Sequence, residues 1–458
     1  MAEKLIAQPR DFPAVEELLQ RPSLAAVIAL VPRPYAALIV KQVIAEVKQR
    51  LKTEKAPITE SDLEREIMAS ISLMKKQEMT RVINATGIVV HTNLGRAPLS
   101  PELFESIKSV VTGYGNVEYD LSGGKRGDRG AACERYLSLL AQAESGAVVN
   151  NNAAALLLIL NTLANRKEVL VSRGELVQIG GGFRIPDILK KSGARLREVG
   201  TTNITTVNDY ESNLSERTGL ILKVHKSNFM QAGFTDETDI GQLVALGRRH
   251  NIPTVNDLGS GVFIPTRKIL GQAEPTVQQS VRSGADLTCF SGDKMLGGVQ
   301  AGLIVGREAL IKKLKRNPLF RTMRLDKIMF AFLERLLSTY LDGDPTDRIK
   351  LWRLLSAPES ELYERGRRIL DQLGRPDGLT VTATRAYVGG GALPQADLPS
   401  AGILFDAKHR PTALMNKFRL MEPPVIGRIE NDRFMLDLKA VAEDELTILG
   451  EAIGRAIS

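Results

Sequence analysis

The chain has 458 residues, which at about 100–200 residues per domain allows two to four domains and excludes a single small binding module. Charged residues make up 25% and hydrophobic residues 43%, so we expect a chain that folds around a sizeable core rather than a disordered one. The net charge of +8 permits binding of nucleic acids or anions without requiring it.

Cysteine content and hydropathy indicate the compartment. Cys133 and Cys289 are the only cysteines, too few and too far apart for a disulfide framework or a CxxC metal site. The N-terminus has no apolar run of signal-peptide length, and the longest apolar stretch, from Ala153 to Leu160, is shorter than the roughly 20 residues that span a bilayer. We therefore expect a cytoplasmic protein that is neither secreted nor embedded in a membrane and that holds no metal.

The first 80 residues contain no glycine and predict a separate helical domain. Ser61 and Glu64 form a capping-box pattern, which predicts a helix that continues to about Thr80. An earlier helix is expected from Pro34 to about Leu51, with basic residues at its end that either contact phosphate or form a solvated face. Apolar residues at helical spacing support the later helix: Leu63, Ile67, Ile71 and Met74.

Residues 81–345 alternate short β-rich runs with helical stretches, which is typical of a mostly parallel α/β sheet. Residues 346–458 predict a smaller α+β lobe, with a hairpin near residues 430–432 and a last helix. The expected strands of the larger domain are residues 168–172, 196–199, 220–225, 254–257 and 287–290, and those of the lobe are 380–384 and 402–405, before a helix near 412–420.

A lysine at the end of an apolar strand is the first candidate for chemistry. The strand begins at Leu287 and runs into Ser291-Gly292-Asp293-Lys294, and ligands of α/β sheets bind at this carboxyl end. Lys294 can form a Schiff base with pyridoxal phosphate and move protons, or it can be an ordinary loop lysine. Asp257 ends another strand 37 residues earlier, where it is either a turn residue or the acid that keeps the pyridine nitrogen of that cofactor protonated. Together the two residues favour a cofactor site.

The cofactor phosphate requires a third element. Val148 and Val149 end a strand that leads into an Ala-rich helix, whose first N–H groups and dipole favour an anion. The candidate phosphate ligands are Asn152, Ala153 and Ala154, with the hydroxyl of Ser291. The alternative is a plain Asn-capped core helix.

Arginines supply a candidate anion site. Arg96 follows Thr92-Asn93-Leu94-Gly95, and Arg321 and Arg324 are spaced so that, in a helix, both would lie on one face and grip one oxyanion. The Gly-rich segment 122–130 either approaches the active site of a neighbouring subunit or is a surface loop.

These stretches resemble bacterial selenocysteine synthases, the L-seryl-tRNA(Sec) selenium transferases. The resemblance covers nearly the whole chain and is carried by INATGIVVHTNLGRAPLS, VEYDL, VVNNNAAALLL, VSRGELVQIGGGFRIPDI, EVGTTN, GFT, NDLGSG, FSGDKMLGG and QAGLIVG, in that order. It implies a fold-type-I pyridoxal-phosphate enzyme, similar in fold to aspartate aminotransferase. It also implies a homo-oligomer built as a pentamer of dimers.

The resemblance also implies residue roles. Lys294 matches the cofactor lysine, Asp293 the adjacent acid, and Asp257 the acid at the pyridine nitrogen. His225 is expected at the cofactor ring or its phenolic oxygen. The substrate-side arginines are Arg96, Arg321 and Arg324, which handle the selenium donor and the seryl group. The helical domain, residues 1–80, resembles the part of the family that recognises the D-arm of selenocysteine tRNA, with phosphate contacts expected from Arg33, Lys41, Lys48 and Lys52.

The implied reaction begins with serine esterified to tRNA. Lys294 removes the seryl α-proton, loss of the hydroxyl leaves a dehydroalanyl-tRNA, and selenophosphate supplies selenium to the β-carbon. One alternative is a related pyridoxal-phosphate lyase that acts on a small amino acid or amino-sugar acid. A second alternative is a non-catalytic RNA-binding relative, which the presence of Lys294, Asp257 and the arginines disfavours.

Overall fold

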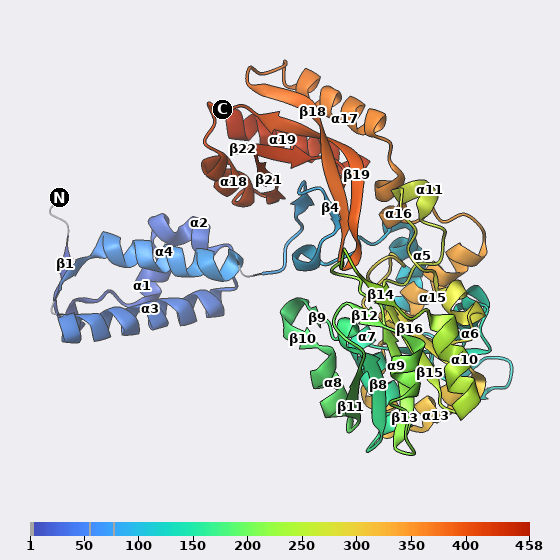
Figure 1. Ribbon diagram of the computed structural model, residues 1–458. Helices are drawn as coiled ribbons and strands as arrows, with labels where there is room; N and C mark the ends of the chain where they lie inside the picture. The colour runs from blue at the N-terminus through green and yellow to red at the C-terminus, as the bar shows by residue number, and fades with distance from the viewer. Residues whose placement is uncertain (1–3, 55, 77) are drawn as a thin grey trace. The chain divides into compact units, whose positions relative to one another are not determined.

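The structure is a computed structural model that describes residues 4–54, 56–76 and 78–458. The chain divides into two compact units, Met1–Arg81 and Val82–Ser458, each of which is described by itself (Figure 1). No single helix among the described residues is long and apolar enough to cross a membrane, and one bent pair, α2 (Pro22–Ile28) with α3 (Arg33–Glu54), passes that test only by length and composition.

The N-terminal unit is helical, as predicted. Its described elements are β1 (Leu5–Ile6), the 3-10 turn η1 (Pro9–Asp11), α1 (Val15–Gln20), α2, α3, β2 (Ile58–Thr59) and α4 (Glu60–Lys76). Leu63, Ile67 and Ile71 of α4 are fully buried and pack with apolar residues of α1, α2 and α3, so these helices share one core. Burial of this apolar stripe stabilises the unit, including α1 and α2, which have 6 and 7 residues and are too short to be stable alone.

Three details of this unit differ from the sequence prediction. The capping box is formed by Thr59 and Asp62 instead of Ser61 and Glu64: the Asp62 carboxylate accepts the Thr59 N–H at 3.0 Å, and the Thr59 hydroxyl accepts the Asp62 N–H at 3.1 Å. Glu64 instead binds Arg21 at 2.6 Å. Helix α4 ends at Lys76, before Thr80, and Met74 is 39% exposed.

The second unit contains a seven-stranded sheet with the order β11-β8-β13-β15-β16-β17-β7. All strands are parallel except β17, which is antiparallel to both neighbours, so the predicted mostly parallel sheet is confirmed. The strands are β7 (Ser145–Val149), β8 (Glu168–Ser172), β11 (Arg195–Val199), β13 (Thr218–Val224), β15 (Thr254–Gly259), β16 (Leu287–Ser291) and β17 (Gly302–Gly306).

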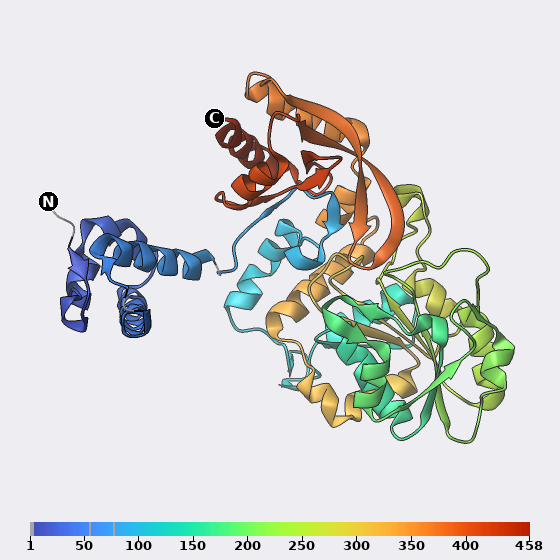
Figure 2. The same cartoon turned by 60° about the vertical axis from the view of Figure 1, so that its left-hand side comes forward.

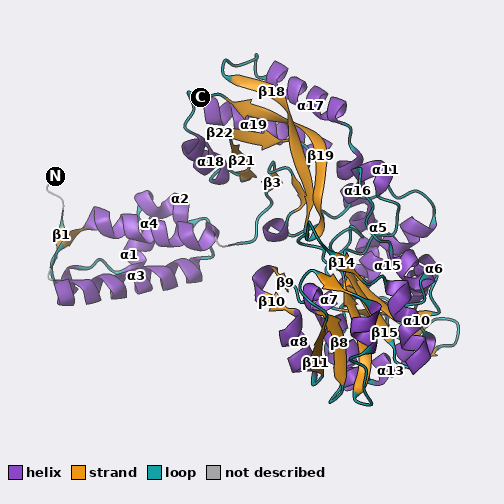
Figure 3. Ribbon diagram, in the orientation of Figure 1, coloured by secondary structure: helices purple, strands orange, loops and turns teal. Residues whose placement is uncertain are grey.

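Helices cover both faces of this sheet (Figure 3). Alternate residues of a strand point to opposite faces, so Ile304 packs with one layer while Leu303 and Val305 pack with the other. The first layer holds α7 (Asn152–Ala164), α8 (Ile185–Ser192) and α13 (Glu308–Arg316). The second layer holds α5 (Pro101–Thr112), α6 (Ala131–Ala141), α12 (Val277–Arg282) and α15 (Lys327–Leu341). Apolar residues of α9 (Val207–Glu211) and α10 (Ile240–His250) form a separate, smaller cluster.

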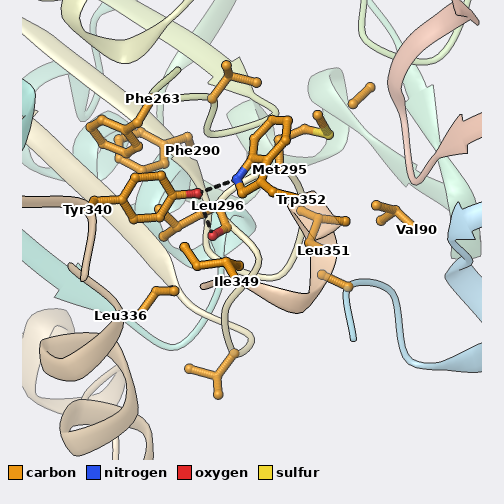
Figure 4. Packing of buried hydrophobic residues seen from close by; sticks show 14 of the residues in the cluster. Val90, Phe263, Phe290, Met295, Leu296, Leu336, Tyr340, Ile349, Leu351 and Trp352 are labelled. Atoms are coloured by element: carbon orange, nitrogen blue, oxygen red, sulfur yellow. Dashed lines mark hydrogen bonds between the residues drawn. The ribbon is translucent and has the colours of Figure 1, made fainter. Parts of the chain in front are cut away.

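A buried hydrogen-bonded pair supports the loop that follows β16. Tyr340 of α15 donates its hydroxyl to the carbonyl of Leu296 at 3.0 Å, and Trp352 of α16 (Lys350–Ser356) donates its indole N–H to the Tyr340 hydroxyl at 2.7 Å (Figure 4). Trp352 is fully buried and Tyr340 is 6% exposed. Because both polar groups are satisfied inside an apolar core, they fix the position of Leu296, two residues after Lys294.

The C-terminal lobe is built on a five-stranded sheet of order β21-β22-β19-β18-β4. The long hairpin of β18 (Leu379–Gly389) and β19 (Ala392–Phe405) extends from this lobe toward the large sheet (Figure 2). β4 (Ile88–Val90) pairs with β18, and β3 (Ile83–Asn84) pairs with β20 (Val425–Ile426), so the start of this unit contributes strands to the lobe. The lobe's other elements are β21 (Arg428–Glu430), β22 (Arg433–Asp437), α17 (Glu359–Gln372), α18 (Pro411–Arg419) and α19 (Leu446–Ile457).

Candidate active site

Lys294 lies in the turn that follows β16 and is only 6% exposed. The turn is anchored on both sides: the Met295 N–H donates to the Ser260 carbonyl at 3.0 Å, and the Gly298 N–H donates to the Gly292 carbonyl at 2.9 Å. Burial lowers the pKa of Lys294, and the positive charge of Arg96 lowers it further, while Asp257 acts in the opposite direction. A buried amine with a lowered pKa is suited to act as a base or nucleophile.

Asp257 lies on β15, directly beside the lysine strand, where it is paired in register with Cys289 of β16. Its Oδ1 accepts a hydrogen bond from Asn152 Nδ2 at 2.8 Å and faces the Cys289 thiol at 3.7 Å. Burial raises the pKa of this carboxyl group, whereas the Asn152 hydrogen bond and the charge of Lys294 lower it. The structure thus brings Asp257 and Lys294 to neighbouring strand ends, as predicted.

Helix α7 begins at Asn152, beside Asp257. The Asn151 side chain accepts the N–H of Ala154 at 2.8 Å and caps the helix, so this N–H, a predicted phosphate donor, is already bonded. Among the described residues, no hydrogen bond is made by the N–H groups of Asn152 and Ala153 or by the buried Asn152 Oδ1. These donors at the positive end of a 13-residue helix, together with the buried Ser291 at the end of β16, can bind a phosphate.

Arg96 reaches the residue next to the lysine. Its Nη1 lies 2.5 Å from Oδ2 of Asp293. Arg96 has a positive φ of 69°, and its N–H donates to the carbonyl of His91 at 2.9 Å, so a tight turn presents the side chain. Asp293 is buried, and its other oxygen, Oδ1, has no hydrogen bond among the described residues.

Arg321 and Arg324 do not form the expected helical pair. Helix α14 (Pro318–Thr322) ends before Arg324, because Asp326 caps the next helix, α15, by accepting the N–H of Ile328 at 2.8 Å. Arg324 lies 3.4 Å from Glu118. Arg321 is exposed and makes no hydrogen bond or ion pair with the described residues.

The arginine segment nevertheless lies near the end of β7, just before the start of α7. The Asn150 N–H, at the end of β7, donates to the Met323 carbonyl at 2.9 Å. Glu118 precedes β5 (Tyr119–Asp120), which pairs with β6 (Lys125–Arg126), and it also binds Arg129 at 2.9 Å. The predicted Gly-rich loop is therefore tied to the arginine segment of its own chain.

His225 follows β13, and its backbone N–H donates to the Asp257 carbonyl at 2.9 Å. Its Nδ1 lies 3.5 Å from Oε1 of Glu274, a buried carboxylate that sequence reasoning did not select. Burial raises the pKa of Glu274, while the charges of His225 and Lys294 lower it. Glu274 lies in irregular chain between α11 (Arg267–Leu270) and α12, so no strand-end pattern identified it.

A turn of the C-terminal lobe covers the lysine. Gly390 and Gly391 join β18, which ends at Gly389, to β19, and all three glycines have positive φ angles. A Cβ atom placed on Gly391 would lie 3.7 Å from Lys294 Nζ and 3.5 Å from the Ser227 hydroxyl oxygen. The hairpin turn therefore closes one side of the site, and its positive φ angles favour glycine at these positions.

Comparison with known proteins identifies the family. Residues 82–442 match the sequence model of the family described as SelA, L-seryl-tRNA selenium transferase. The chain belongs to this family. It is 42% identical to the L-seryl-tRNA(Sec) selenium transferase of Aquifex aeolicus, an alignment that covers 96% of this chain and 99% of that protein. It is also 42% identical to the enzyme of the same name from Geobacter metallireducens, over 96% of this chain and 98% of that protein.

A structural comparison confirms the fold. D-glucosaminate-6-phosphate ammonia-lyase superposes with a TM-score of 0.59 at 19% identity, covering 84% of this chain and 97% of that one. At this identity the likeness concerns the fold alone. The family and the α/β fold class predicted from the motifs are therefore both confirmed.

The residues of this family member fit pyridoxal phosphate. A buried lysine, a buried carboxylate on the neighbouring strand and two N–H groups at a helix N-terminus are the kinds of group that would suit the aldehyde, ring nitrogen and phosphate of the cofactor. The unbonded Asn152 Oδ1 is a further buried polar atom at this site. Groups of this kind are normally satisfied by a ligand or by water.

Proposed function

We propose that this protein converts L-seryl-tRNA(Sec) to L-selenocysteinyl-tRNA(Sec), with selenophosphate as selenium donor and pyridoxal phosphate as cofactor. The observation that carries the proposal is the buried Lys294, which follows the strand beside that of Asp257 and comes directly after Asp293, the partner of Arg96. The proposal is supported by the similarity of nearly the whole chain to enzymes named for this reaction.

Five groups would hold the cofactor. Lys294 would bind its aldehyde carbon and Asp257 its ring nitrogen, while the N–H groups of Asn152 and Ala153 and the Ser291 hydroxyl would bind its phosphate. His225 would lie beside the ring, fixed through its backbone to Asp257. When bound, pyridoxal phosphate supplies an electron sink for charge that develops at the substrate α-carbon.

Lys294 would also move the proton. Because burial and Arg96 lower its pKa, a larger fraction of its side chain is neutral at a given pH than for an exposed lysine, and a neutral amine can accept the seryl α-proton. The seryl carboxyl group is an ester in the tRNA-bound substrate, so the site needs no arginine for a free α-carboxylate.

The arginines would bind the selenium donor. Arg96 is already oriented by Asp293, whereas Arg321 has no partner among the described residues and is free to bind an oxyanion. Arg324 would contribute a further positive charge from beside Glu118. Guanidinium groups bind phosphate-like oxyanions through two parallel hydrogen bonds, which would hold the donor for attack at the β-carbon.

The N-terminal unit would bind the tRNA. The alignments with the named transferases cover 96% of this chain, so they include most of this unit. Lys41 and Lys52 are exposed and would contact phosphates, whereas Arg33 is paired with Glu16, and Lys48 lies 5.1 Å from the centre of the Phe12 ring. The proposal further includes a homodecamer of five dimers, located in the cytoplasm, on the basis of the family resemblance.

A gel-shift experiment separates this proposal from a lyase acting on a small amino acid or amino-sugar acid. The full chain should retard selenocysteine tRNA, and ordinary serine tRNA should compete poorly. Retardation of neither tRNA, together with release of ammonia from a small amino acid, would favour the lyase.

A further inference from the structure

A cavity of about 440 Å³ opens beside His225 and Glu274. Its walls come from the segment that follows β13, from the loop that carries Glu274, and from Leu393 at the start of β19. These segments belong to the same compact unit, so the cavity lies within one described body of the chain.

Residues that line the cavity follow closely in the chain on residues that lie beside Lys294. Leu393 lies two residues after Gly391, whose backbone faces Lys294 Nζ. Phe229 lies two residues after Ser227, whose hydroxyl faces the same glycine. At the inner end, His225 joins the cavity to the site, because its Nδ1 lies 3.5 Å from Glu274 Oε1 and its backbone N–H donates to the Asp257 carbonyl at 2.9 Å. The cavity is therefore an extension of the candidate active site.

The chemistry of an aminoacyl-tRNA determines what must occupy such an extension. The reacting serine is joined to a ribose hydroxyl through one ester linkage, so the terminal nucleoside must lie directly beside the group that binds the α-carbon. We propose that this cavity binds the 3′-terminal nucleoside of the substrate. This inference rests on the proposed function and adds a binding site for the end of the tRNA.

The lining suits a nucleoside better than a polyanion. Phe229 and Met230 provide apolar surface for the flat face of a base. Lys226 is bonded to Glu237 at 2.8 Å and Lys223 to Glu175 at 2.9 Å, so the lysines near the cavity are largely neutralised. A largely neutralised lining of this kind accommodates a base and a ribose with at most one phosphate at the rim.

The inner end offers free hydrogen-bonding capacity. Glu274 Oε1 and His225 Nδ1 are buried and lie 3.5 Å from each other, and neither atom makes a further hydrogen bond with the described residues. A ribose hydroxyl can donate to the carboxylate and accept from the imidazole, which would satisfy both atoms. Such a contact would hold the ribose, and with it the ester-linked serine, at the lysine.

The test uses the full-length, cofactor-loaded protein and a stable analogue in which serine is joined by an amide to 3′-amino-3′-deoxyadenosine. Calorimetry should show binding of this analogue, and L-serinamide, which lacks the nucleoside, should bind at least about tenfold more weakly. Met230→Trp would fill the apolar part of the cavity, and Met230 is 52% exposed, so the larger side chain should not disturb the core. We expect Met230→Trp to weaken binding of the analogue by about tenfold and to raise the KM for seryl-tRNA(Sec) by about tenfold. The KM for selenophosphate should not change.

Phe234→Trp is the matched control, because Phe234 is 92% exposed, lies in the same segment and does not line the cavity. It should bind the analogue like the unchanged protein. Equal binding of the analogue by the Met230→Trp protein, or equal binding of analogue and serinamide by the unchanged protein, would overturn the inference. Formation of selenocysteine by the unchanged protein tests the proposed function separately. The nucleoside site can therefore be disproved while the proposed function stands.

Discussion

The two halves of the candidate site differ in how far their polar groups are satisfied. Asp257 is buried and bonded to the partly buried Asn152, and Lys294 is buried in a turn anchored on both sides. Arg321, by contrast, is exposed and has no partner among the described residues. We call Lys294, Asp257 and Asn152 the cofactor half of the site, and Arg96, Arg321 and Arg324 the anion half. The difference indicates that the cofactor half is organised before any ligand arrives, whereas the anion half is completed by its ligand.

Removal of the lysine should have the largest effect. Lys294→Ala should reduce turnover by at least about a thousandfold, because it removes both the attachment point of the cofactor and the proposed base. Binding of selenocysteine tRNA in a gel shift should remain unchanged. Selenocysteinyl-tRNA formation by this variant at a normal rate would contradict the role of Lys294.

A buried ion pair next to the site should matter for stability. Lys223 Nζ lies 2.9 Å from Glu175, which is 3% exposed, and Lys223→Met would leave this carboxylate buried without its partner. We expect a loss of about 3 kcal/mol in the free energy of unfolding, measured by urea denaturation. Lys226→Met is the control, because its partner Glu237 is 54% exposed, and it should cost at most about 1 kcal/mol.

The loss in the Lys223→Met protein should depend on pH. Burial raises the pKa of Glu175 in the folded state, and removal of Lys223 should raise it further. A carboxyl group with a raised folded pKa favours folding at low pH, and this contribution is lost as the pH rises through the folded pKa. The variant should therefore be closer in stability to the unchanged protein at about pH 5 than at about pH 8. An equal loss at both pH values would contradict this account of the pair.

Neutralising the buried carboxylate tests the cofactor half alone. Asp257→Asn keeps the size of the side chain but removes the negative charge that would face the ring nitrogen. Turnover should fall by about a hundredfold while the KM for seryl-tRNA(Sec) stays the same, as measured by steady-state kinetics on cofactor-loaded protein. Unchanged turnover would show that Asp257 does not act on the cofactor.

Substitution of Arg321, in the anion half, should have the smallest effect on the kinetic constants. Arg321→Ala should raise the KM for selenophosphate by about tenfold and leave the KM for seryl-tRNA(Sec) unaltered. Arg316→Ala removes another exposed arginine of the same region and should change neither constant. An equal effect of both substitutions would mean that Arg321 contributes only to the general positive charge.

The sequence alone predicted that Lys294 and Asp257 of the cofactor half lie at neighbouring strand ends. Lys294 and Asp257 stand at the ends of apolar runs, and parallel strands bring such ends to one edge of a sheet. The sequence did not predict Glu274, because this residue lies in irregular chain. It did not predict that Gly391 lies beside Lys294, because this contact depends on a hairpin from the C-terminal lobe. The condition for a shared helical face of Arg321 and Arg324 is not met, because α14 ends at Thr322 and Asp326 caps a new helix, which the spacing of the two arginines does not reveal.

We expect this chain to make selenocysteine on selenocysteine tRNA and not on ordinary serine tRNA. The most direct test is to incubate the purified protein with selenophosphate and either seryl-tRNA(Sec) or ordinary seryl-tRNA, and to identify the amino acid released from each tRNA by mass spectrometry. Our account predicts selenocysteine from seryl-tRNA(Sec) only. Serine recovered unchanged from both tRNAs, with the cofactor bound to the protein, would contradict it.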